Sequence, residues 1–88
     1  LQMQRIKEQR ERNAREVQEY KEKNPCADCN KFYPSYVMDF DHISDDKLKN
    51  VSVLVKRGSR KQIWQEIEKC ELVCANCHRI RTNTRGRG

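Results

Sequence analysis

Two cysteine pairs lie far apart in the chain, and their thiols have the spacing of metal ligands. Cys26 and Cys29 form the first pair, and Cys74 and Cys77 form the second. Two intervening residues let one turn present both sulfur atoms to a single ion, and Zn²⁺ accepts four thiolates at ~2.3 Å. We therefore predict a structural Zn²⁺ site that clamps together the two ends of the intervening segment.

A fifth cysteine, Cys70, is left over. Its helical spacing from Ile63 and Ile67 predicts a small buried thiol rather than a fifth ligand. The odd cysteine count, the paired spacing and the lack of a secretory signal pattern at the start favour a reducing, cytoplasmic compartment. A redox role for the cysteine pairs is disfavoured, because the surrounding βαβ pattern of redox proteins is missing.

Asp41, His42 and His78 form a second group that could do chemistry. His78 directly follows the second cysteine pair, and Asp41–His42 end a predicted strand that follows the first pair. The zinc would therefore bring them together. An aspartate and an imidazole, Asp41 and His78, can hold Mg²⁺, Mn²⁺ or a similar ion, while His42 can take a proton from water near neutral pH. This chemistry suits phosphodiester hydrolysis.

The role of Asp39 is open at this stage. Adjacent residues of a strand point to opposite faces, so Asp39 shares a face with Asp41 and not with His42. Asp39 could orient His42, lie near the metal, or simply be solvated.

The charge balance favours a nucleic-acid partner. Lys and Arg total 19 against 13 Asp and Glu, for a net charge of +6. Residues 79–88 hold four arginines and no acid, whereas residues 1–23 hold seven basic and five acidic residues. We predict that Arg79, Arg81 and Arg85 bind phosphates of double-stranded DNA. No apolar run approaches the ~20 residues of a membrane span, so no membrane partner is expected.

Periodicity and helix-breaking residues predict the elements. Asn24–Pro25 should end a first helix, Ser59 should begin a later one as its N-cap, and Tyr36, Met38 and Phe40 should share the core face of a strand. The segment 51–55 is ambiguous between strand and helix. We predict a helix over 1–23, a metal-knuckle turn over 26–34, a strand over 36–41, an irregular segment over 43–57 with a cap at Asp45 or Asp46, a helix over 60–70, an extended link over 71–73, and a last helix over 78–85 with Gly86 as its stop.

Asp41–His42 together with Cys74–Ala75–Asn76–Cys77–His78–Arg79 resembles the HNH endonucleases, and the subtype with two cysteine pairs is the closer match. The resemblance implies a small α+β fold, a ββα-metal finger with a four-cysteine zinc, and nicking or double-strand cutting of DNA. It implies that His42 is the general base and that Asp41 and His78 hold the catalytic ion. Such proteins are frequent in phages and mobile elements. The implied division is a charged helix over 1–24, the nuclease domain over 25–85 and a frayed tail over 86–88.

One position departs from the family's pattern. Lys69, between Glu68 and Cys70, aligns with the asparagine at the centre of the family's name. Asn50, Asn76 and Asn83 are possible substitutes, and the sequence does not choose among them. The alternative interpretation is a non-catalytic zinc module that binds nucleic acid, which the same cysteines and basic tail would serve.

Overall fold

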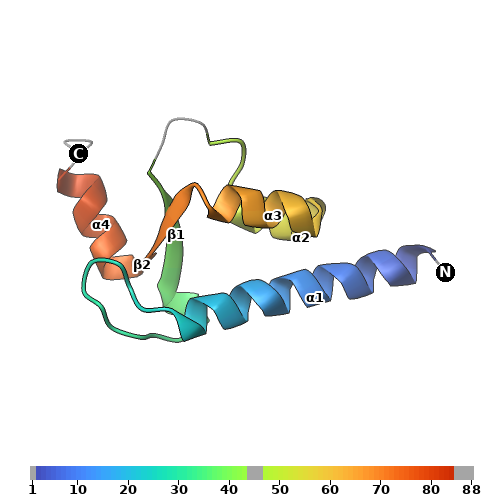
Figure 1. Cartoon of the computed structure of the whole chain (residues 1–88), viewed down its shortest axis with the longest axis horizontal. Coiled ribbons are helices and arrows are strands. Elements are labelled where there is room, and N and C mark those ends of the chain that lie inside the picture. The colour runs from blue at the N-terminus through green and yellow to red at the C-terminus, as the bar shows by residue number, and fades with distance from the viewer. Residues whose placement is uncertain (1, 44–46, 85–88) are drawn as a thin grey trace.

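The chain forms a small α+β structure in which helices flank a two-stranded antiparallel sheet (Figure 1). The computed structural model describes residues 2–43 and 47–84, with side chains described from residue 7 onward. Within these ranges it contains four α-helices and one 3₁₀ helix. In chain order the elements are α1 (Gln2–Lys23), η1 (Ser35–Val37), β1 (Met38–His42), α2 (Val51–Arg57), α3 (Arg60–Ile67), β2 (Cys70–Cys74) and α4 (Ala75–Thr84).

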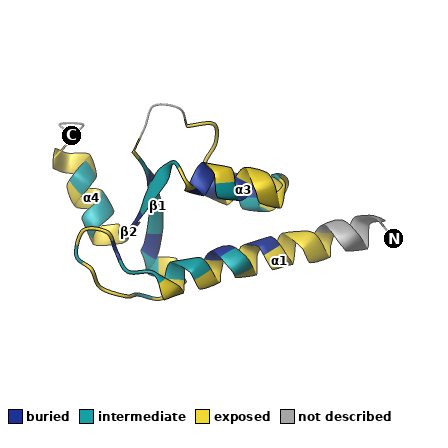
Figure 2. Ribbon diagram, in the orientation of Figure 1, coloured by how far each residue is buried: buried dark blue, intermediate teal, exposed yellow. Residues whose placement is uncertain are grey.

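Helix α1 is the long N-terminal helix that the sequence predicts. It ends at Lys23, and the Asn24 side chain donates a hydrogen bond to the Tyr20 carbonyl at 2.8 Å, which satisfies one of the carbonyls at the helix end. Among its side chains from residue 7 onward, buried ones occur only in the C-terminal half of the helix, namely Asn13 and Val17 (Figure 2). The preceding half extends past the rest of the molecule (Figure 1).

The two strands pair with Met38 opposite Cys74 and His42 opposite Cys70. The predicted strand over 36–41 is therefore displaced, because η1 occupies residues 35–37 and the Val37 N–H donates to the Pro34 carbonyl. The prediction that Tyr36 lies on the core face is wrong: its side chain is 87% exposed, whereas Met38 is buried. The predicted link over 71–73 is the centre of strand β2.

Residues 51–57 form helix α2, so the expectation of an irregular segment is wrong there. Val51 and Leu54 are buried three residues apart, which is helical and not strand spacing. Asp45 and Asp46 lie outside the described residues. The next helix begins where predicted: the Ser59 hydroxyl accepts from the Gln62 N–H and the Gln62 side chain accepts from the Ser59 N–H, a complete capping box.

Two small clusters of buried side chains make up the core. Residues of α1, α2 and α3 form the first, namely Val17, Val51, Leu54, Ile63 and Ile67. The second belongs to the sheet and the cysteine cluster, namely Cys26, Met38, Leu72, Val73 and Cys74. Tyr20 and Phe40 pack against both clusters, and their rings stack with centroids 6.0 Å apart. The metal-ligand candidates are thus part of the packing that fixes the sheet.

Helix α4 begins at Ala75, three residues before the predicted start at His78. The reason is that strand β2 runs directly into the helix, so that Cys77 and His78 both lie in its first turn. Its predicted end at Arg85 and Gly86, and the tail over 86–88, lie outside the described residues. None of the helices in the described part of the chain has the length and apolar character to cross a membrane.

Candidate metal centre and its surroundings

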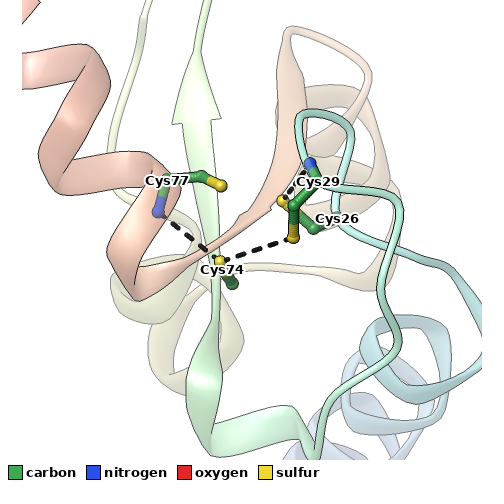
Figure 3. A group of neighbouring side chains, drawn as sticks. All are labelled: Cys26, Cys29, Cys74 and Cys77. Carbon is green, nitrogen blue, oxygen red and sulfur yellow. Dashed lines mark hydrogen bonds between the residues drawn. The ribbon is translucent and has the colours of Figure 1, made fainter.

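The four paired cysteines converge on one point. The sulfur atoms of Cys26, Cys29, Cys74 and Cys77 all lie within 4.8 Å of one another (Figure 3). The Cys29 and Cys74 sulfurs are 4.0 Å apart, close to the ~3.8 Å edge of a tetrahedron with ~2.3 Å metal–sulfur bonds. All four are free thiols rather than disulfides. The cluster could hold a structural metal such as zinc, as the spacing predicts.

Backbone geometry supports a thiolate at Cys26 in this cluster. In each pair the backbone N–H of the second cysteine donates to the sulfur of the first. The nitrogen–sulfur distance is 3.4 Å from Cys29 to Cys26 and 3.5 Å from Cys77 to Cys74. Burial opposes ionisation of Cys26, but backbone N–H groups lower its pKa to about 6. Asn30 closes the first turn with a φ of 62°, a left-handed conformation that asparagine tolerates well.

Cys70 lies outside this cluster. Its thiol donates to the Glu66 carbonyl at 3.3 Å, and burial raises its pKa to about 11. It is partly buried and packs against the first core cluster. The expectation that Cys70 is not a fifth ligand therefore agrees with the structure, but the helix predicted over 60–70 ends at Ile67, and Cys70 is a partly buried thiol at the start of strand β2 rather than on a helix face.

His78 lies between two carboxylates of strand β1. Its Nδ1 is 3.1 Å from Asp39 Oδ2, and its Nε2 is 3.6 Å from Asp41 Oδ1. Asp39 and Asp41 face helix α4 together because they are two residues apart on the strand. The structure thus brings Asp41 and His78 together as predicted. It resolves the position of Asp39, which contacts His78 and not His42.

Arg81 binds three acids from three different segments. Its guanidinium donates to Asp28 and Glu71 at 2.7 Å and to Asp41 Oδ2 at 2.8 Å. Hydrogen bonds from Arg81, with a smaller contribution from its charge, hold the pKa of Asp28 below its usual range. The predicted phosphate contact of Arg81 remains a prediction, and a phosphate would have to compete with these carboxylates. Sequence reasoning missed this cluster because its acids lie 10 to 53 positions from Arg81.

His42 faces the opposite side of the sheet, toward helix α3. Its Nε2 is 2.8 Å from Glu66 Oε2. Sequence reasoning missed Glu66, although a signal was present. Ile63, Glu66, Ile67 and Cys70 have i, i+3, i+4, i+7 spacing, so that an acid lies within the apolar stripe of the helix.

A groove of about 560 Å³ connects the two sides of strand β1. His42, His78, Asp39 and Phe40 line it, together with side chains of α1 and α2. The two histidines therefore share one solvent-accessible space even though they lie against opposite faces of the sheet.

A second hollow lies on the other side of His78. Arg79, Thr82 and Asn76 line it together with Asp39, and Arg79 is exposed there. The position of Arg79 is compatible with its predicted contact to phosphate. Arg85 lies outside the described residues.

Comparison with known proteins gives no indication of the function of this chain. No family model matches the chain, and no curated protein or solved structure matches it. Any functional conclusion must therefore rest on the residues themselves.

Proposed function

We propose that this chain is a metal-dependent DNA endonuclease of the HNH type, which hydrolyses phosphodiester bonds in double-stranded DNA by nicking or double-strand cutting. One observation carries the proposal. Asp41 Oδ1 and His78 Nε2 face each other at 3.6 Å, while the other nitrogen of His78 is bonded to Asp39. Metal-binding histidines usually donate their other ring N–H to a carboxylate, a backbone carbonyl or water, which fixes the ring and its tautomer.

The donor set fits a hard divalent cation such as Mg²⁺ or Mn²⁺. One carboxylate oxygen and one imidazole nitrogen, from Asp41 and His78, would hold the ion, and few protein ligands leave positions for water and phosphate. A cation bound there would stabilise negative charge on the phosphate and on the leaving oxygen. Arg81 holds the other oxygen of Asp41, which turns Oδ1 toward His78.

The remaining residues have roles that follow from their positions. His42 takes a proton from water as the general base, and it lines the same groove as His78. Arg79 contributes positive charge beside His78 for the DNA backbone. The four-cysteine cluster, holding zinc, fixes the strand and helix that carry Asp41 and His78, in the manner of a ββα-metal finger.

A specific observation favours the alternative, a zinc module that binds nucleic acid without cutting it. Asp41 is already bonded to Arg81 and His78 to Asp39, so these side chains are satisfied as ion pairs within the protein. Such a network stabilises a fold without any second metal. It does not, however, explain why His42 and His78 line a common groove.

Cleavage of supercoiled plasmid separates the two functions. We expect the zinc-loaded chain to nick or linearise plasmid in Mg²⁺ or Mn²⁺, and to lose this activity in EDTA too dilute to remove zinc. His42→Ala should slow cleavage by about 10²–10⁴-fold, the usual contribution of a general base, and should shift DNA on a gel like the wild type. Glu68→Gln, on the exposed end of α3, is the control.

Two outcomes would decide against the nuclease. A wild-type chain that retards DNA but cuts none of it in either cation would support the binding module. Equal cleavage by wild type and His42→Ala would remove His42 from the reaction.

A further inference from the structure

Glu66 is a buried acid on helix α3 whose carboxylate accepts three hydrogen bonds. Its side chain is 2% exposed. The donors are His42 Nε2 at 2.8 Å, the Leu48 N–H at 2.9 Å and Lys69 Nζ at 3.2 Å. Burial raises the pKa of a carboxyl group, yet these donors together leave the pKa of Glu66 below its usual value. Glu66 is therefore an ionised carboxylate inside the protein.

Burying an ionised carboxylate costs folding free energy. A buried charge must be fully compensated, and an apolar side chain at such a position is often as stable or more stable. Ile63 and Ile67, the neighbours of Glu66 on the same stripe, are both buried in the first core cluster, so Glu66 is a charged residue beside apolar ones. The most direct effect of the carboxylate is on His42, to which it makes its shortest bond.

An ionised carboxylate can only accept hydrogen bonds, so the hydrogen between Glu66 and His42 must be on Nε2. In a neutral imidazole the other nitrogen, Nδ1, then carries the lone pair. Within residues 7–43 and 47–84, no group hydrogen-bonds to Nδ1 of His42. The contact with Glu66 therefore leaves Nδ1 as the nitrogen that can take a proton.

We propose that Glu66 is a positioning residue for His42: it fixes the Nε2–H tautomer and the ring orientation, and so leaves Nδ1 as the proton acceptor. This inference rests on the proposed nuclease function.

The first test is the tautomer of His42, measured by ¹⁵N NMR of the zinc-loaded chain at pH 8, where an ordinary histidine is neutral. The sequence contains only His42 and His78, so the spectrum of His42→Ala assigns the signals. We expect the Nε2–H form in the wild type and a mixture of tautomers in Glu66→Gln, whose amide can donate as well as accept. An Nδ1–H ring in the wild type would overturn the proposal.

The second test is plasmid cleavage by the same variants. Glu66→Gln should lower kcat by at least about tenfold, within the about 10²–10⁴-fold contribution of a general base, while KM should change less than about twofold because the Glu66 side chain is buried. Glu68→Gln makes the same chemical change two residues away on an exposed side chain and should leave both constants unchanged. A loss confined to KM would contradict the positioning role.

The two proposals fail in different ways. No cleavage by the wild type overturns the nuclease function, whatever the tautomer. Cleavage by the wild type with an unchanged kcat in Glu66→Gln overturns the positioning role alone. Should Glu66→Gln fail to retain zinc, the wild-type tautomer decides, together with kcat of Glu66→Asp, which keeps the charge but moves it away from His42.

Discussion

At the scale of single residues, the proposal depends on how His78 is held. Its two ring nitrogens have different partners: Asp39 on Nδ1 and Asp41 on Nε2. Asp39 and Asp41 therefore contact different nitrogens of the same ring, with Asp41 Oδ1 3.6 Å from Nε2. In the proposed nuclease these two aspartates of one strand face would have different functions.

Asp39→Asn tests this division of roles. The amide cannot accept a hydrogen bond with the strength of a carboxylate, so the ring of His78 should be held less firmly. We expect the Mn²⁺ concentration for half-maximal cleavage to rise about 10- to 100-fold, as for other second partners of metal-binding histidines. The measurement is a Mn²⁺ titration of plasmid cleavage, with Glu68→Gln as the control. An unchanged half-maximal concentration would mean that Asp39 is merely a surface partner of His78.

Some of these residues could be identified from the sequence and others could not. Asp41, His42, His78 and the cysteines stand out because their types and short spacings are unusual in themselves. Glu66 and Arg81 do not, because their roles depend on which segments the fold brings together. Glu66 was detectable only as a charge in an apolar stripe, and Arg81 looked like any other residue of a basic tail.

At the scale of elements, Arg81 links four segments. The guanidinium lies on α4 and binds Asp28 of the first knuckle, Asp41 of β1 and Glu71 of β2. These segments otherwise meet mainly at the cysteine cluster and the sheet. Arg81 therefore keeps α4, and with it His78, in register with the strand that carries Asp41.

Arg81→Met should destabilise the fold by about 2–4 kcal/mol. Removing one partner of a buried ion pair typically costs about 3–5 kcal/mol of stability. We expect a smaller loss for Arg81→Met because Asp28 and Glu71 are partly exposed. The matched control is Arg60→Met, which removes an exposed pair with Glu16 and should cost less than about 1 kcal/mol. Urea denaturation of the zinc-loaded variants measures both. Equal losses would show that the Arg81 contacts behave as surface ion pairs.

The prediction of elements succeeded where local chemistry is decisive. Ser59 and Gln62 form their capping box without help from the rest of the chain, and Asn24–Pro25 ends α1 for a local steric reason. The segment 51–55 has no such signal, because Val51, Val53 and Val55 alternate like a strand. It becomes helix α2 because Val51 and Leu54 can then both enter the core formed by α1 and α3.

At the scale of the whole molecule, the hydrophobic core is split into two clusters, and we expect the fold to need the metal cluster as a further source of stability. Ten hydrophobic residues of the described chain are buried, and they fall into two clusters that share Tyr20 and Phe40 at their boundary. Two of the buried ten are Cys26 and Cys74, which belong to the metal cluster. Small domains of this kind commonly depend on a structural metal for much of their stability.

Substitution of single cysteines tests this dependence. Cys74→Ser should lose tight zinc binding and the cooperative unfolding transition at 25 °C, because zinc contributes roughly 10–16 kcal/mol in comparable small sites against a typical domain stability of about 5–15 kcal/mol. Cys70→Ser should retain one zinc per chain and lose only about 1–2 kcal/mol, since Cys70 is a core thiol outside the cluster. Metal analysis and thermal denaturation by circular dichroism provide the two measurements. If the Cys74 variant melted like the wild type, the sheet and helix α4 would be held by packing alone, and the convergence of Asp41 and His78 would not require the metal cluster.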